Sequence, residues 1–240
     1  MSDLESKPWA SAARWPGSYW RGLAVVVLAY AVVLGGFLAS TQGLPYILDN
    51  NETYSSLVHA TNILRFGVKQ TYGLADESYG LEPSQHPYVY THGGNFPRFY
   101  TLLLYVLGAR TAEAQIATTT FSVGLVGLLL AYHFFSRVAT PLFAVVYCLL
   151  LITDWVMQTQ WLVNTWRAWH HFFAFSSLLC VHGLVRRGRL PPWLVAITLL
   201  NFVCLAYFEV VFAAFVTLLS AIYAGLILRR RLRRLLQSWL

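Results

Sequence analysis

Two carboxylates at the start of a polar segment are the first candidates for chemistry. Asp49 and Glu52 lie three residues apart in the stretch LDNNETY, directly after an apolar run. Carboxylates at such a boundary suit general-base catalysis or metal binding. The same residues also suit the start of a helix, where acidic side chains stabilise the first turn. The local pattern favours the helix start and leaves the catalytic interpretation open.

A second group of polar side chains precedes and surrounds a Gly-Gly pair. Its members are His86, Tyr88, Tyr90, His92, Asn95 and Arg98. Tyrosine and histidine combine an apolar body with a polar tip, which suits a sugar, and an arginine can bind a phosphate with two parallel hydrogen bonds. The alternative is an ordered loop with aromatic side chains at the level of the lipid headgroups. The composition leaves these two interpretations equally open.

A third group lies further along the chain, in a segment rich in tryptophan. An aromatic belt at the membrane surface explains the tryptophans, but it does not explain Arg167 together with the adjacent His170 and His171. Glu209 is the acidic residue expected between two apolar runs. A carboxylate within a membrane indicates a functional site, or else a protonated group paired with a neighbouring helix.

The composition identifies the environment in which these groups work. Of 240 residues, 57% are hydrophobic and only 11% are charged. A soluble domain usually has about 25% charged residues, and disordered chains have even fewer apolar residues than soluble ones. The three cysteines stand singly in apolar runs, which excludes a disulfide scaffold. The sequence therefore predicts an all-α integral membrane protein.

The net charge of +7 is concentrated in clusters that directly follow apolar runs, around Arg186 and around Arg229. Such clusters are typical of anchoring beside anionic lipid headgroups at the cytoplasmic surface. Proteins that bind nucleic acid usually spread basic residues over a folded face. We therefore expect membrane lipids, and no nucleic acid, as partners.

About six apolar runs are long enough to predict membrane-spanning helices. They cover residues 22–39, 115–135, 141–157, 169–185, 193–208 and 210–228. The last two adjoin across Glu209 and could form one long or kinked element. With the N-terminus in the cytoplasm, most basic residues fall inside, in agreement with the positive-inside rule. The absence of a targeting peptide favours a multi-pass protein of the bacterial inner membrane.

This topology predicts three regions. Residues 1–21 form a cytoplasmic segment, residues 22–228 a transmembrane domain with a large outer loop over 41–113, and residues 229–240 a basic cytoplasmic tail. Helical spacing over 53–66, with Gly67 as a C-cap, and over 99–107 predicts two helices lying on the outer membrane surface. The arrangement requires that residues 99–108 do not cross the membrane.

The order of these features resembles the N-terminal half of the GT-C membrane glycosyltransferases, the superfamily of protein O-mannosyltransferases and aminoarabinose transferases. The resemblance covers residues 22–228, and order and spacing match better than individual residues. It is carried by the acidic motif 49–52, the helix end ATNILRFG, His86-Pro87, Phe96-Pro97-Arg98, Leu107-Gly108, and the outer segment 161–171.

The resemblance implies transfer of a sugar from a polyprenyl-phosphate carrier to an acceptor on the non-cytoplasmic face. Members carry adjacent Asp-Glu in the first outer loop, whereas here the acids are split, and we favour Asp49 over Glu52 as the catalytic base. The implied substrate-binding residues are His86, Tyr90, His92, Asn95 and Arg98, with Arg167 and His170 as second candidates. A divalent metal is the one cofactor that we consider, and its presence is left open.

Members of the superfamily are about twice as long as this chain. We therefore expect a compact relative, the N-terminal module of a longer enzyme, or a pseudoenzyme, with a protein partner as a source of the missing helices. The alternative from another class is a non-catalytic membrane subunit that binds a lipid or a partner protein through the outer loop. A transporter, motivated by Glu209, is the third hypothesis.

Overall fold

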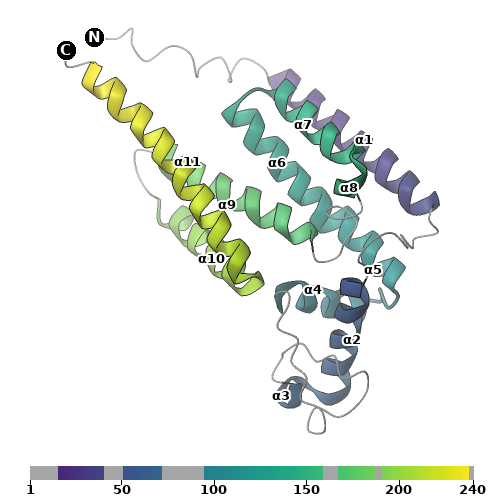
Figure 1. Cartoon of the computed structure of the whole chain (residues 1–240). Coiled ribbons are helices and arrows are strands. Elements are labelled where there is room, and N and C mark those ends of the chain that lie inside the picture. Colours follow the sequence, from purple (N-terminus) through teal and green to yellow (C-terminus); the bar gives the residue numbers. More distant parts are fainter. Residues whose placement is uncertain (1–15, 41–50, 72–94, 159–166, 187–190, 238–240) are drawn as a thin grey trace.

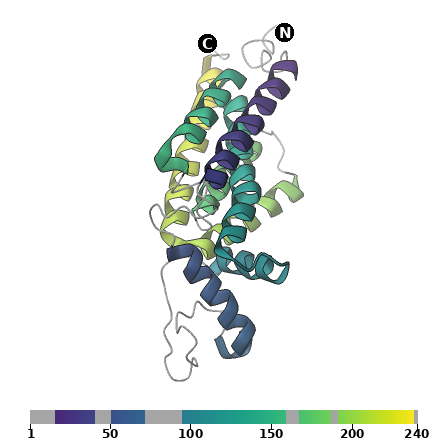
Figure 2. The ribbon, with the colours of Figure 1, turned by 90° about the vertical axis from the view of Figure 1, so that its right-hand side faces the viewer.

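The computed structural model is helical throughout the residues that it describes, which are 16–40, 51–71, 95–158, 167–186 and 191–237. Long helices lie side by side, and a smaller group of helices gathers at one end of them (Figure 1, Figure 2). The helices are α1 (Pro16–Ser40), α2 (Asn51–Phe66), α3 (Val68–Thr71), α4 (Asn95–Val106), α5 (Ala112–Thr119), α6 (Leu125–Val138), α7 (Pro141–Thr153), α8 (Trp155–Met157), α9 (Ala168–Arg186), α10 (Pro192–Phe208) and α11 (Val210–Gln237).

Four helical segments are long and apolar enough to cross a membrane: Gly17–Ser40, Ala112–Val138, Ala168–Arg186 and Val210–Arg229. The predicted class, a helical membrane protein, is therefore confirmed. The helices α7 and α10 are apolar but shorter, with 13 and 17 residues. A crossing by these two helices, and with it the count of six, stays a prediction.

The predicted run 141–157 is interrupted, which corrects the sequence-based boundary. Thr140 accepts a hydrogen bond from the backbone N–H of Phe143, Pro141 occupies the first turn, and α7 then ends at Thr153. The backbone of Asp154 is extended, and its carboxylate accepts from the N–H of Met157, 2.8 Å away. A carboxylate that caps a new helical turn explains why the run does not continue as one helix.

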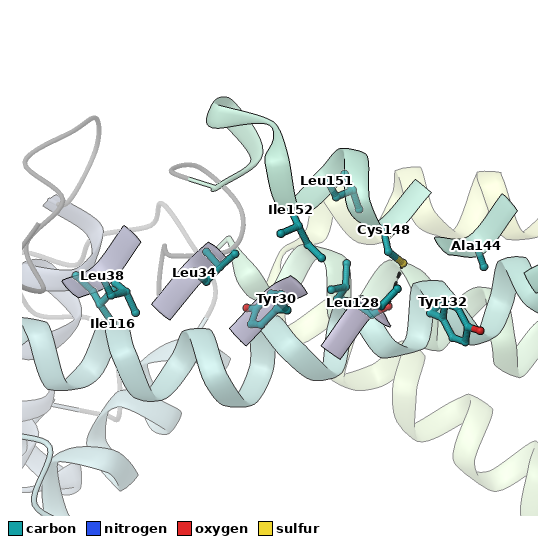
Figure 3. Close-up of a cluster of buried hydrophobic side chains, with 11 residues drawn as sticks. Tyr30, Leu34, Leu38, Ile116, Leu128, Tyr132, Ala144, Cys148, Leu151 and Ile152 are labelled. Carbon is teal, nitrogen blue, oxygen red and sulfur yellow. Dashed lines mark hydrogen bonds between the residues drawn. The ribbon is translucent and has the colours of Figure 1, made fainter. Parts of the chain in front are cut away.

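The helix α6 is one centre of the bundle, because it packs against α1, α7 and α9. Side chains from α1, α5, α6 and α7 form a buried cluster between these helices (Figure 3). A π-helical turn over Thr120–Gly124 joins α5 to α6. The hydroxyl of Tyr30 in α1 donates to the carbonyl of Thr120 at 2.7 Å. The same oxygen also accepts from the backbone N–H of Leu125, so Tyr30 adds a side-chain hydrogen bond from α1 to the π turn.

The helix α9 is the second centre, in contact with α6, α10 and α11. A residue without a side chain allows α6 and α9 to approach closely. A β-carbon at Gly127 of α6 would lie 3.1 Å from the backbone nitrogen of Phe172 and 3.3 Å from the β-carbon of His171. Since both atoms belong to the start of α9, neither can move without a shift of the whole helix.

We expect Gly127→Val to destabilise the protein by about 1–3 kcal/mol, because it overpacks the contact between α6 and α9. The matched control is Gly36→Val in α1, where an added β-carbon meets nothing within 4 Å. Thermal unfolding in detergent should show a lower Tm for the first variant than for the second. Equal Tm values would contradict the close approach.

The helices predicted over 53–66 and 99–107 are both present, the first beginning two residues earlier, and their place on the outer membrane surface stays a prediction. The helix α2 ends at Phe66, and Gly67 has a φ of 81°, as expected for a C-cap. The helix α4 begins at Asn95, four residues before the predicted start, and has 12 residues, too few to cross a membrane. It packs against α2, α5 and α10.

The alternative of one long or kinked element over 193–228 is wrong, because the chain leaves the helical conformation at Glu209 and α11 packs back against α10. The backbone of Glu209 is extended, with φ −160° and ψ 118°, and separates α10 from α11. Its carbonyl accepts the first hydrogen bond of α11, from the N–H of Ala213 at 2.8 Å. The two helices pack against each other and both pack against α9.

Candidate functional site

The helices α2 and α4 meet at one end of the bundle (Figure 1). Several polar side chains of these two helices are buried. His59 of α2 is 1% exposed and Arg98 of α4 is 8% exposed. Arginine is rarely buried to this degree unless its charge serves a structural or binding role. Other buried polar residues of the two helices are Thr53, Ser56, Asn62 and Thr101.

The electrostatic state of this cluster follows from burial and from Arg98. Burial, and to a smaller extent the positive charge of Arg98, together lower the pKa of His59 to about 3. His59 is therefore neutral at physiological pH, whereas a guanidinium remains charged. Among the described residues, the cluster thus contains a guanidinium charge beside an uncharged imidazole, and a guanidinium is a common donor to a phosphate.

A buried glutamine fixes the position of α4. The side-chain amide of Gln115 in α5 donates to the carbonyl of Thr101 at 3.1 Å and to the carbonyl of Ala109 at 2.6 Å. These bonds attach both the middle of α4 and the segment that follows it to α5. Because Arg98 lies one helical turn before Thr101, its backbone is held by the same contacts.

A histidine and a glutamate from distant parts of the sequence form a pair at the start of α9. The Nε2 atom of His170 lies 2.9 Å from Oε2 of Glu209. The imidazole packs edge-on against Phe208 and Phe212, with ring centroids 4.8 and 4.5 Å apart. The extended backbone of Glu209 directs its carboxylate toward α9 instead of continuing α10. The pair can move a proton between its members or hold the imidazole in one orientation.

The helix α4 connects the two polar groups. Tyr100, two residues after Arg98, packs edge-on against Trp169 with ring centroids 5.3 Å apart. Its hydroxyl lies 2.6 Å from Oγ of Ser122 in the π turn. Trp169 is the neighbour of His170 in α9. One short helix therefore contacts α2 through the segment around Arg98 and α9 through Tyr100.

The structure describes only part of the predicted site. Asp49, His86, Tyr90 and His92 lie outside the described residues. Glu52 lies in the first turn of α2, and Asn95 is the first residue of α4. Arg167 directly precedes α9, where its carbonyl accepts from the N–H of His170 at 3.0 Å. Arg98 and His170 are both buried at the end of the bundle where α4 lies.

His59 was not among the predicted site residues. A usable signal was present, because His59 and Ile63 are four residues apart and share the buried face of α2. His170 and Glu209 were each predicted as candidates, but their pairing was not predicted. Glu209 lies in the turn between α10 and α11, where it has a partner, which weakens the reason for a transporter.

No group of three histidine, cysteine, aspartate or glutamate side chains within the described part of the chain could hold a metal ion.

The buried state of His59 predicts a pH dependence of stability. The pKa of His59 is about 3 in the folded protein and 6.5 when the group is solvated. The contribution of neutral His59 to the free energy of unfolding is fully present above pH 6.5. It is lost as the pH falls toward 3, because the imidazole binds a proton more readily in the unfolded chain than in the folded one. Between about pH 7.5 and about pH 5 the loss is on the order of 2 kcal/mol.

Thermal unfolding at the two pH values checks this expectation. We expect His59→Gln to reduce the difference in Tm between them, whereas Thr61→Ala, an exposed position of the same helix, leaves that difference unchanged. The same pH dependence in wild type and His59→Gln would show that His59 does not titrate in this way.

Comparisons with known proteins give no relative from which a role could be transferred. No protein-family model matches the chain. No curated protein and no solved structure has a significant match to it either.

Proposed function

We propose that this chain is a membrane glycosyltransferase, or the N-terminal module of one. It transfers a sugar from a polyprenyl-phosphate carrier to an acceptor on the non-cytoplasmic face. The observation that supports this most strongly is the burial of Arg98 in α4, beside neutral His59. A permanent positive charge is thereby held at the end of a helical membrane bundle, where the phosphate of a membrane-anchored donor would lie.

In the proposed reaction, Asp49 or Glu52 accepts the proton of the acceptor hydroxyl or amine. The acceptor atom forms a bond to the anomeric carbon while the bond from that carbon to the phosphate oxygen breaks. The lipid phosphate leaves with the bonding electron pair, and Arg98 stabilises its charge. The location of Glu52 in the first turn of α2, which packs against α4, is compatible with this division of roles.

The remaining candidates bind the sugar or orient the donor. His86, Tyr90, His92 and Asn95 precede Arg98 in the chain and would contact the sugar. Arg167 and His170 at the start of α9 would assist on the side where Tyr100 meets Trp169. In this proposal Glu209 is a positioning residue, because it acts through the imidazole of His170.

The proposal includes the orientation of the protein in a bacterial inner membrane. Arg137 and Arg186 occupy the last turns of α6 and α9, and Arg229 follows the apolar part of α11. These helix ends lie away from α2 and α4 (Figure 1). A basic end on the cytoplasmic side agrees with the positive-inside rule and puts α2 and α4 on the outer side.

The test is transfer of sugar from a polyprenyl-phosphate donor by purified wild type, Asp49→Asn and Glu52→Gln. We expect one of the two variants to lose transfer by at least 100-fold while it still binds the donor. Wild-type transfer by both variants would contradict the assigned base. Donor binding without transfer by the wild type would favour a non-catalytic subunit that binds lipid.

A further inference from the structure

The opposite end of the bundle contains two tyrosine–histidine pairs, each of which joins two helices. The hydroxyl of Tyr19 in α1 lies 2.9 Å from Nδ1 of His133 in α6. The hydroxyl of Tyr223 in α11 lies 2.6 Å from Nδ1 of His182 in α9. Four helices thus contribute to one polar group near the ends of α6 and α9.

In both pairs the tyrosine hydroxyl lies within hydrogen-bond distance of the Nδ1 atom of the imidazole. When a tyrosine O–H donates to Nδ1, the ring proton resides on Nε2, which becomes a hydrogen-bond donor. His182 is 7% exposed, and its Nε2 has no hydrogen-bond partner among the described residues. Leaving a buried polar atom without a hydrogen-bond partner is costly, and a bound ligand is one way of satisfying it.

Two arginines provide positive charge at the same place. Arg137 and Arg186 are exposed and lie in the last turns of α6 and α9. Both interact electrostatically with His182, and Arg137 also interacts with Tyr19 and His133. The imidazole of His182 is therefore in the field of two guanidinium groups, which favour a ligand that carries negative charge.

The acidic residues of the same helices lie at their other ends. Glu113 is in the first turn of α5, which continues through the π turn into α6 and reaches Arg137. Asp154 follows the end of α7. Glu209 is bound to His170 at the start of α9, whereas Arg186 is in its last turn. The charge at the basic end is thus not balanced by these carboxylates.

We propose that this end of the bundle binds the phosphate group of an anionic lipid, with Arg137, Arg186 and the Nε2 atom of His182 as its donors. The position at the ends of membrane-spanning helices favours a lipid headgroup as the source of the phosphate. A free phosphate has the same chemistry and is distinguished by experiment. The site is separate from the donor site proposed around Arg98.

The experiment titrates the full chain in a neutral detergent and follows thermal unfolding. The probes are dihexanoylphosphatidylglycerol, the zwitterionic dihexanoylphosphatidylcholine, and inorganic phosphate. We expect a saturable rise of Tm with the glycerol lipid and little change with the choline lipid. A rise of equal size with inorganic phosphate would support the phosphate site and identify a free anion as its ligand.

Variants distinguish lipid binding at this site from a general attraction of anionic lipid to a basic protein. We expect Arg137→Gln/Arg186→Gln to weaken binding at least tenfold, and His182→Phe, which keeps an aromatic ring, to weaken it about tenfold. The matched control is Arg65→Gln/Arg110→Gln, which removes two exposed arginines near the other end. Equal weakening by the control, or unchanged binding in His182→Phe, would overturn the proposal.

A second measurement does not depend on the folding of a variant. Native mass spectrometry of the wild type, taken from vesicles with equal amounts of phosphatidylglycerol and phosphatidylcholine, counts the retained lipids. Preferential retention of one phosphatidylglycerol supports the site, whereas retention in proportion to the mixture contradicts it.

Discussion

Arg98→Ala is expected to lower the affinity for a polyprenyl phosphate by about 10- to 100-fold. The substitution removes charge-assisted hydrogen bonds to the phosphate, which are worth roughly 1.5–3 kcal/mol. Arg98→Lys should retain part of the affinity, because it preserves the charge but not the planar pair of donors. Equilibrium binding of a fluorescent polyprenyl phosphate to the purified chain in detergent measures both changes.

A second arginine serves as the control for this effect. Arg65 lies in the last turn of α2 and is exposed, so Arg65→Ala removes the same charge from the same end of the molecule. We expect Arg65→Ala to bind like the wild type. If the two alanine variants lose affinity equally, the attraction is diffuse and Arg98 does not form the phosphate site.

Glu209→Ala is expected to destabilise the protein by about 2–3 kcal/mol. The carboxylate is 2.9 Å from Nε2 of a histidine that is packed between Phe208 and Phe212. Its removal leaves the polar imidazole buried without this partner. The extended turn between α10 and α11 also loses its link to α9. Thermal unfolding should show a large fall of Tm.

Two further variants test whether the loss of stability in Glu209→Ala comes from the broken pair with His170. Glu209→Gln keeps an acceptor at the same distance and should cost less than Glu209→Ala. Glu113→Ala removes a carboxylate from the first turn of α5 and should cost at most about 1 kcal/mol. A Tm of Glu209→Ala no lower than that of Glu113→Ala would show that the pair with His170 contributes little.

Features that depend on local pattern were predicted well. The helical spacing over 53–66 and the glycine that follows it gave the extent of α2 and its left-handed C-cap, because capping depends on few neighbouring residues. The interruption at Asp154 was missed. The hydrophobicity of the run predicts one helix, but the carboxylate of Asp154 caps a new helical turn and thereby ends the preceding helix.

Features that depend on distant contacts were not predictable from spacing. His170 and Glu209 are separated by 39 residues, and they meet because α10 turns back at an extended residue. The π turn accepts a hydrogen bond from Tyr30, 90 residues away. The burial of Arg98 arises from the packing of α4 against α2 and α5, whereas the sequence only indicated a basic residue after a proline.

The most direct test of the account compares wild-type binding of a polyprenyl phosphate with binding of the corresponding polyprenol, which has the same hydrocarbon chain but no phosphate. We predict saturable binding of the phosphate at one molecule per chain and at least tenfold weaker binding of the alcohol. Equal affinity for the two lipids, or no saturable binding of the phosphate, would contradict a donor site built around Arg98.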